Sequence, residues 1–118
     1  IETDAKACDV IRQNIALIKN RISDSDSRLV VKRTPVLTFV KQPENLYRYD
    51  LVIADPPYDY DVETDIVPIV SSGGYIVYET TSEKLQDCKS ALVKHPQIEE
   101  IVVTRSVGSS AVVIARVI

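Results

Sequence analysis

One short segment limits the folds open to this chain more than any other. Residues 51–54 are Leu, Val, Ile and Ala, an unbroken apolar run with Asp50 before it and Asp55 after it. A strand that is buried on both faces has this pattern, because its side chains do not alternate between apolar and polar. Both faces of a strand are buried when helices pack on either side of a parallel sheet. The segment therefore predicts an α/β fold.

The remaining segments alternate between helical and extended patterns. A helix is expected from Asp4, which can cap it, with an apolar stripe at positions 8, 11, 15 and 18. Further helices are expected at 62–70, which Pro68 weakens, and at 82–94, where Ser82 can act as the cap. Strands are expected at 28–32, 50–55, 74–78, 98–104 and 111–118, with a helical turn or strand at 36–40 and loops at 23–27 and 42–49. Residues 107–110 are typical of a hairpin turn, so one C-terminal strand should run antiparallel.

Length and composition are those of one globular domain. The chain has 118 residues, 45% of them hydrophobic, and its 14 Lys and Arg against 17 Asp and Glu give a formal charge of −3. No apolar run approaches the roughly 20 residues that cross a membrane. The acidic balance argues against nucleic acid as a partner, because Lys and Arg carry that binding. Since the chain begins at Ile1, lacks Met and shows no secretory signal, we expect a processed protein or part of a longer one.

The cysteines and the histidine give no sign of a metal site. Cys8 and Cys88 lie among apolar neighbours in predicted helices, and we expect buried, reduced thiols in a cytoplasmic protein. His95 is the only histidine, whereas a structural zinc needs about four ligands. The three Asp residues between positions 59 and 65 fit no cation-binding spacing and are expected in a solvated loop. Lys84 and Lys89 could contact phosphate, but solvated side chains are the simpler expectation.

Four residues that follow the apolar strand combine rigidity with hydrogen-bond acceptors. In Asp55-Pro56-Pro57-Tyr58, each proline restrains the residue before it and lacks an N–H. The Asp55 carboxylate and the Pro56 carbonyl can hold both hydrogens of an NH₂ on a planar group, and stacking on Tyr58 adds about 1–3 kcal/mol. The lone pair of that amine is then positioned for an electrophile. The alternative is a strand end at which Asp55 merely caps a turn.

The segments around this motif carry a resemblance to a known family. Residues 50–58 are similar to the amino-methyltransferase signature of class I S-adenosylmethionine (SAM) enzymes. Residues 1–4 with the helix that contains Asn14 and Ile15, residues 74–79 and the Gly108 hairpin resemble the RsmD-type family. Members of that family methylate the N2 of a guanine in 16S ribosomal RNA (rRNA). The resemblance extends over nearly the whole chain, and the motif is its most specific part.

The resemblance implies a Rossmann-like class I methyltransferase sheet, mainly parallel with a C-terminal antiparallel hairpin, that here lacks the first strand and its Gly-rich cofactor loop. Residues 1–118 would be the C-terminal two-thirds of a single SAM-dependent methyltransferase domain. Without the first strand the sheet would be split, so this chain alone should neither fold well nor bind SAM. The implied protein is a cytoplasmic, monomeric enzyme of rRNA processing that needs no metal or membrane. Its partner would be 16S rRNA or an assembly intermediate of the small ribosomal subunit, and RNA-binding basic residues would lie in the missing part.

The resemblance also assigns roles to individual residues, and the four motif residues become the expected catalytic residues. Glu2 would accept the ribose hydroxyls of SAM, and Thr3 would lie against its adenine. Asp55 and the Pro56 carbonyl would hold the guanine amine, while Tyr58 would stack on the flipped base.

The sequence departs from the family's pattern at two further places, and three alternative functions stay open. Thr34-Pro35 stands where the family usually has an acid or Asn, which leaves the adenine-edge contact unassigned, and Val107 replaces an aromatic residue before Gly108. An adenine-N6 methyltransferase on DNA or RNA is the main alternative, since adenine also offers an NH₂. Methylation of a protein glutamine more often uses Asn at position 55. A truncated, non-catalytic α/β binding module is the alternative that the missing cofactor loop favours, and a Gly-rich strand–loop–helix upstream of Ile1 would exclude it.

Overall fold

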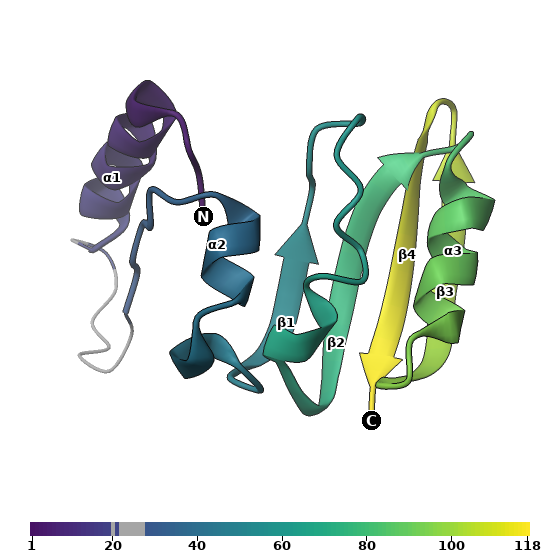
Figure 1. Ribbon diagram of the computed structural model, residues 1–118. Coiled ribbons are helices and arrows are strands. Elements are labelled where there is room, and N and C mark those ends of the chain that lie inside the picture. The colour runs from purple at the N-terminus through teal and green to yellow at the C-terminus, as the bar shows by residue number, and fades with distance from the viewer. Residues whose placement is uncertain (20, 22–27) are drawn as a thin grey trace. The chain divides into compact units, whose positions relative to one another are not determined.

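The structure, a computed structural model, describes residues 1–19, 21 and 28–118 (Figure 1). It consists of two compact units, Ile1–Phe39 and Val40–Ile118. The predicted loop at 23–27 lies outside the described residues. Of the helices that the structure describes, none is long and apolar enough to cross a lipid bilayer.

The first unit is built around helix α1 (Ala5–Lys19). Asp4 caps this helix as predicted, because its Oδ1 accepts the N–H of Ala7 at 2.7 Å and so satisfies a donor of the first turn. Within the predicted apolar stripe Cys8 is fully buried, whereas Ile11 and Ile18 remain exposed. The stripe is therefore present but largely uncovered.

The predicted strand at 28–32 is wrong. Leu29 and Val30 are exposed, and the β-pairing described near them is a single parallel bridge between Glu2 and Arg33. An apolar run becomes a strand only where neighbouring strands satisfy its backbone groups, and this region has one bridge instead of a ladder. At 36–40 the helical alternative forms, as the short helix α2 (Val36–Val40).

The second unit is a four-stranded sheet with the strand order β1-β2-β4-β3. The strands are β1 (Tyr49–Ala54), β2 (Val70–Thr81), β3 (Ile98–Val107) and β4 (Ser110–Val117), and helix α3 (Leu85–Lys94) connects β2 to β3. The β1–β2 pair is parallel, whereas β4 runs antiparallel to β2 and β3, so the predicted hairpin is confirmed. Its two-residue turn places Gly108 at a φ of 59°, a conformation that glycine adopts without strain.

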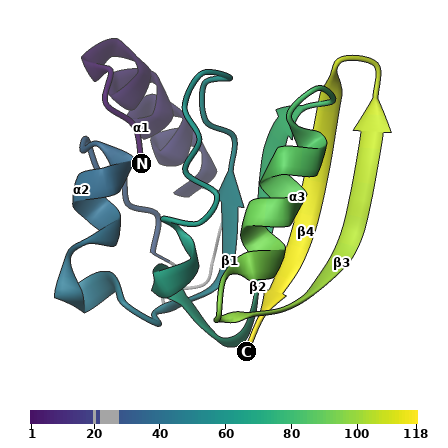
Figure 2. The same ribbon diagram turned by 45° about the vertical axis from the view of Figure 1, so that its right-hand side comes forward.

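The core of this unit lies between α3 and one face of the sheet, across which the helix runs in Figure 2. Leu85, Cys88 and Leu92 of α3 are buried, as expected from their spacing along one side of the helix. Alternate side chains of β2 and β4 complete the core, and they are Ile76, Tyr78, Thr80, Ala111, Val113 and Ala115.

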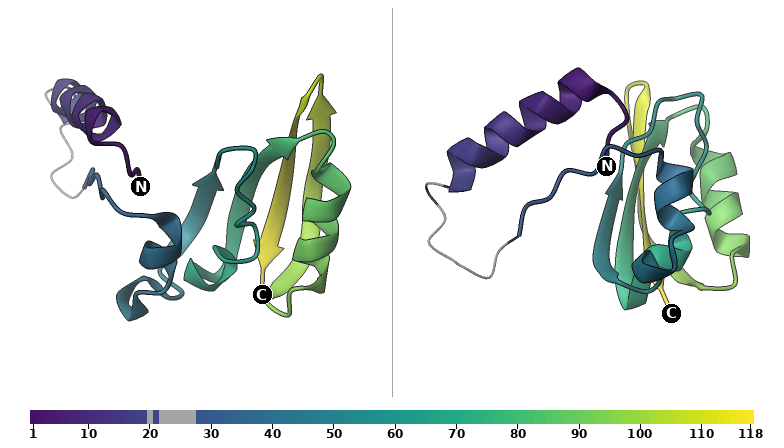
Figure 3. Two further views of the ribbon diagram at one scale, coloured as in Figure 1. Left: turned by 45° about the horizontal axis from the view of Figure 1, so that its top comes forward. Right: turned by 60° about the vertical axis from the view of Figure 1, so that its left-hand side comes forward.

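The opposite face of the sheet is exposed. Leu51 and Ile53 of β1 pair with Tyr75 and Val77 of β2, and the side chains of Leu51, Ile53 and Tyr75 are 55%, 66% and 40% exposed. In the right-hand view of Figure 3, α3 lies on one side of the sheet. The expected parallel pairing of the 50–55 strand is confirmed, but its burial on both faces is not, because α3 covers only one face.

The connections around β2 differ most from expectation. The predicted helix at 62–70 is instead a set of turns ending in the 3₁₀ helix η2 (Val67–Ile69), whose first turn contains Pro68. Proline lacks the N–H that an α-helix would need at that position. A second 3₁₀ helix, η1 (Pro43–Asn45), lies in the predicted loop at 42–49. Ser82 does not cap α3: its Oγ donates to the Gly108 carbonyl at 2.7 Å and ties the end of β2 to the hairpin turn.

Candidate active site

The predicted motif lies where β1 ends and the chain leaves the sheet. Asp55 is the first residue after β1, and its side chain is exposed. Within the described part of the chain, no donor hydrogen-bonds to its carboxylate. The Pro57 carbonyl accepts the N–H of Tyr60 at 2.9 Å and closes a turn in which Tyr58 is 61% exposed. The carboxylate and the Tyr58 ring are therefore both accessible to a ligand.

A shallow hollow accompanies the motif at this end of the sheet. Two strands contribute to it, because the motif follows β1 and the remaining lining comes from the end of the adjacent β2 and from the loop between them. The lining residues are Pro56, Pro57, Tyr58, Tyr60, Asp61, Tyr78, Glu79 and Thr80. The hollow itself is too small to hold a water molecule. The carboxyl ends of parallel strands are where ligands bind in open α/β sheets, so the exposed motif beside it is the candidate site for a substrate.

Tyr78 of β2 anchors the loop that follows the motif. Its hydroxyl accepts the N–H of Val62 at 3.1 Å and donates to the Tyr60 carbonyl at 3.5 Å. Burial raises the pKa of this hydroxyl, the hydrogen bond from Val62 opposes the rise, and the nearby Glu63 and Asp61 carboxylates add to it. Tyr78 therefore stays neutral at physiological pH and keeps the proton that it donates.

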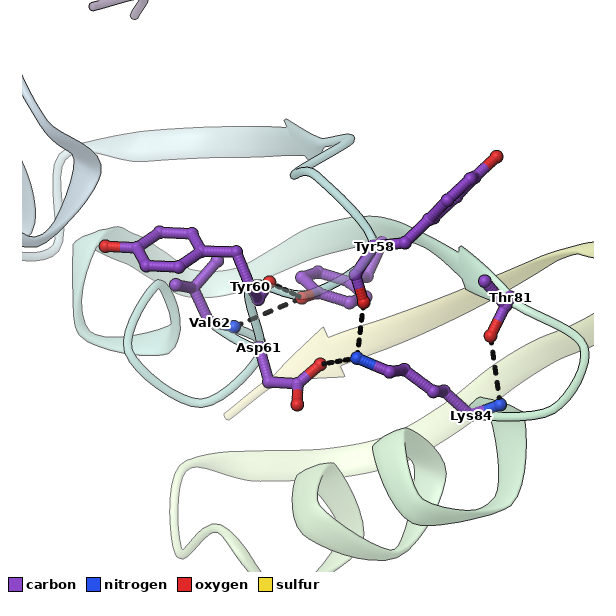
Figure 4. Close-up of polar contacts among 7 residues, drawn as sticks. Tyr58, Tyr60, Asp61, Val62, Thr81 and Lys84 are labelled. Atoms are coloured by element: carbon purple, nitrogen blue, oxygen red, sulfur yellow. Dashed lines mark hydrogen bonds and ion pairs between the residues drawn. The ribbon is translucent and has the colours of Figure 1, made fainter.

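Lys84, between β2 and α3, holds the motif side of the same loop. Its ammonium donates to the Tyr58 carbonyl oxygen and to Asp61 Oδ1, the latter at 3.0 Å. Its own backbone N–H donates to Thr81 Oγ1 at 3.2 Å. Figure 4 shows the Tyr58 carbonyl turned toward the ammonium and the Tyr58 ring pointing away from it. Lys84 thus binds the chain's own loop, a role that differs from both a phosphate contact and a solvated side chain.

Glu2 and Thr3, the residues expected to bind the cofactor, lie in the first unit. The Glu2 Oε1 atom accepts the backbone N–H of Asp4 at 3.0 Å and that of Thr3 at 2.9 Å, and these two hydrogen bonds hold the pKa of Glu2 below its ordinary value. The Thr3 carbonyl accepts Arg33 Nε at 3.0 Å. Because one carboxylate oxygen is fixed by the backbone, the other is oriented and available to hydroxyl donors.

The structure brings Pro56, Pro57 and Tyr58 of the motif together with Glu79, the acid that ends the segment resembling a fifth strand. The roles of Asp55, Pro56, Pro57 and Tyr58, like those of Glu2 and Thr3, stay predictions. Sequence reasoning missed the anchoring contacts of Tyr78 and Lys84. The polar tip of a tyrosine on a buried strand was the available signal for the first, since a buried hydroxyl needs a partner.

Metal binding receives no support from the described residues, in which no group of three or more His, Cys, Asp or Glu side chains could hold an ion. Asp61, one of the acids weighed as a metal ligand, is paired with Lys84 instead. Cys8 and Cys88 are buried free thiols, as expected.

Solved structures from three bacteria have similar folds. A candidate methylase from Haemophilus influenzae matches with a TM-score of 0.71 at 19% identity, over 99% of this chain and 70% of that chain. The candidate methyltransferase yhhF from Escherichia coli gives a TM-score of 0.68 at 15% identity, over 98% and 59%. A conserved hypothetical protein from Streptococcus pyogenes matches with a TM-score of 0.72 at 22% identity, over 99% of this chain and 69% of that chain. The chain thus spans 59–70% of the length of these three relatives. No curated protein matches it in sequence.

Strand order, the antiparallel hairpin and these matches define the class: the chain has the Rossmann-like fold of class I methyltransferases. The motif stands at the carboxyl end of the first strand of the parallel pair, the edge at which ligands bind in open α/β sheets. The chain belongs to the family described as Conserved hypothetical protein 95, the RsmD family, whose model matches residues 1–116. The resemblance predicted from the motif and its flanking segments is confirmed at the level of the family, which supports methyltransferase activity.

Proposed function

We propose that this protein transfers a methyl group from SAM to the exocyclic N2 amine of a guanine in 16S rRNA. Family membership and the class I fold support methyl transfer. One observation carries the choice of an amine as acceptor: the exposed Asp55 carboxylate directly follows β1 and has no donor among the described residues, and Tyr58, three residues later in the same motif, is also exposed. A free acceptor and a free aromatic ring in one rigid motif match a base that bears an NH₂.

In this proposal the motif holds the base and orients its amine. The Asp55 carboxylate and the Pro56 carbonyl accept the two N–H hydrogens, and the Tyr58 ring stacks on the flipped guanine. The nitrogen lone pair then forms the new N–C bond as the S–C bond of the sulfonium breaks, and the amine proton leaves to Asp55 or water. Positioning supplies most of the rate, because oriented reactants gain on the order of 7–11 kcal/mol.

The cofactor residues of the proposal are Glu2 and Thr3. SAM, when bound, supplies the methyl group as an activated sulfonium. The Glu2 carboxylate suits the ribose of such a group, because the backbone N–H groups of Thr3 and Asp4 fix one of its oxygens and hold it ionised, while the other remains free to accept hydroxyl hydrogens. We place the protein in the cytoplasm as a monomer that acts on 16S rRNA or an assembly intermediate of the small subunit.

Mass spectrometry of 16S rRNA from a strain that lacks the gene tests the proposal. One N2-methylguanine should disappear and should return when the full wild-type gene is supplied. Asp55→Ala should fail to restore it, since loss of an acceptor that acts on the reacting amine costs on the order of 100-fold or more in rate. Asp59→Ala, which removes an exposed carboxylate from the same loop, is the matched control and should restore the modification.

Two results would refute the assignment. A lost N6-methyladenine in place of methylguanine would select the adenine alternative, in which the same motif holds a different base. Purified Asp55→Ala protein that still turns over but no longer binds SAM would place Asp55 at the cofactor instead of the amine. We expect its SAM affinity to stay within a few-fold of wild type.

A further inference from the structure

The loop after the motif is held from two sides by residues outside the motif. On one side the buried Tyr78 hydroxyl accepts the N–H of Val62 at 3.1 Å. On the other side the Lys84 ammonium contacts the Tyr58 carbonyl and lies 3.0 Å from Asp61 Oδ1. Both anchoring side chains come from β2 or the turn after it, so the second strand fixes a loop that the first strand supplies.

The contact between Lys84 and Tyr58 leaves the aromatic ring of Tyr58 free. The lysine binds the backbone carbonyl of Tyr58, while the ring of Tyr58 points away and is 61% exposed (Figure 4). The ammonium therefore occupies none of the surface on which a base would stack. The bond fixes the main chain from which that ring projects, and the ring can then rotate only about its own side-chain bonds.

The ion pair with Asp61 directs the ammonium toward this loop. Lys84 has a flexible four-carbon stem, and an exposed carbonyl alone would hold it weakly. Asp61 adds a charged acceptor three residues after Tyr58, so a single ammonium bridges both ends of the Tyr58–Asp61 turn. The Thr81 hydroxyl in turn accepts the backbone N–H of Lys84 and fixes the base of its side chain.

We propose that Lys84 is a positioning residue for substrate recognition, which acts by fixing the Tyr58 backbone so that the aromatic ring is presented to the target base. This inference rests on the proposed function, because it assumes that Tyr58 receives a base. It predicts that Lys84 affects how well the nucleic acid binds, and that SAM binding and the chemical step depend on it little.

The test compares Lys84→Met with Lys84→Arg in the full protein, using rRNA substrate. Lys84→Met keeps the stem and removes the charge, and it should raise KM for RNA about tenfold, within the range of a lost stacking contact, while kcat and SAM affinity stay within about twofold. Lys84→Arg should restore most of the affinity, because it keeps a donor of the same charge. Lys94→Met, which removes the same charge from the exposed far end of α3, is the matched control and should leave KM unchanged.

Amide hydrogen exchange gives a second readout that does not depend on activity. Exchange at residues 58–61 should accelerate in Lys84→Met and return toward the wild-type rate in Lys84→Arg, with the melting temperature of the protein unchanged. Equal losses in melting temperature, kcat and SAM affinity would instead show a purely structural residue and overturn the proposal. Unchanged exchange together with unchanged KM would overturn it as well.

The two proposals can fail separately. If the wild-type protein methylates no guanine, the proposed function fails, whatever the lysine variants show. If the wild type is active and Lys84→Met has a normal KM, only the role of Lys84 fails. Asp61→Asn removes the charge that directs the ammonium and leaves the Tyr58 carbonyl in place, so it should raise KM by no more than Lys84→Met does. A rise larger than that of Lys84→Met would assign the effect to Asp61 itself and refute positioning through the Tyr58 carbonyl.

Discussion

Tyr58 is the residue whose exposure has the most direct consequence for recognition. A ring that is 61% exposed makes little contribution to the core, so replacing it should change binding without unfolding the protein. Tyr58→Ala should raise KM for RNA by about 5- to 150-fold, the equivalent of a stacking energy of about 1–3 kcal/mol, while Tyr58→Phe should stay close to wild type. Steady-state kinetics with varied RNA and varied SAM would separate the two affinities. Equal losses for both would contradict stacking on the base.

Cys88 should make the free energy of unfolding depend on pH in the alkaline range. Burial raises the pKa of its thiol to about 12, and the carboxylates of Glu63 and Asp61 add to the rise. Below its ordinary value of 9.0 the thiol is neutral in both the folded and the unfolded chain. Above that pH the unfolded chain loses the proton first, so the free energy of unfolding should fall steadily between pH 9 and pH 12. The raised pKa of Tyr78 acts in the same direction above pH 10.0.

Urea unfolding at pH 8 and at one-unit steps above it would measure this slope. Lysines and exposed tyrosines titrate in the same range, so Cys88→Ala is the necessary comparison. It removes one buried acid and should give a shallower decline than wild type, although its stability at pH 8 will be lower because of the cavity. Parallel declines in the two proteins would rule out Cys88 as a source of the pH dependence.

Among single residues, the sequence predicted a role only where the residues that act together are neighbours in the chain. Asp55, Pro56, Pro57 and Tyr58 are contiguous, and the rigidity that the prolines impose can be deduced without a fold. Lys84 could not be assigned in the same way, because its partners lie 26 and 23 residues away along the chain. Only the pairing of β1 with β2 brings them within reach.

At the scale of elements, the spacing of apolar residues correctly predicted the helices and the hairpin, which depend on nearby residues. It failed for a strand whose formation depends on pairing with a distant segment. Helices α1 and α3 and the hairpin of β3 and β4 form as expected from their spacing and turn residues. The 28–32 run did not become a strand, because an apolar sequence does not supply its own partner. The 62–70 segment buries Val62, Ile66 and Val67 at near-helical spacing, yet Pro68 limits it to turns and a 3₁₀ helix.

The junction of β1 and β2 depends on one glycine. A Cβ at Gly74 would lie 2.7 Å from Val70 Cγ1 and 2.8 Å from the carbonyl oxygen of Asp50. A backbone oxygen in a paired strand cannot easily move, so Gly74→Ala should lower the free energy of unfolding by about 1–3 kcal/mol. Denaturant unfolding of the full protein would measure the change. Ser72→Ala, at an exposed position two residues earlier, should have almost no effect. A free energy of unfolding equal to that of wild type in Gly74→Ala would contradict this prediction, because it would mean that β1 and β2 move apart here without cost.

At the scale of the molecule, the described strands form a single sheet, and the pairing described outside it is one isolated bridge. β1 is an edge strand of the four-stranded sheet, and the Glu2–Arg33 bridge belongs to the other unit. Which face of that sheet is left uncovered could not be predicted, because a continuous apolar run such as Leu51–Ala54 looks the same whether one face or both are buried.

The uncovered face predicts how the 118 residues behave when expressed alone. Leu51, Ile53 and Tyr75 form an exposed apolar patch next to an unpaired strand edge, a combination that favours association between copies. Ile53→Lys should reduce self-association, measured as the apparent mass by sedimentation or light scattering. Val107→Lys, at an exposed position at the hairpin end, should not. Both changes bring the formal charge of −3 closer to zero, which by itself promotes association. A decrease confined to Ile53→Lys would therefore be due to the patch, and equal effects of the two would exclude the patch as the cause.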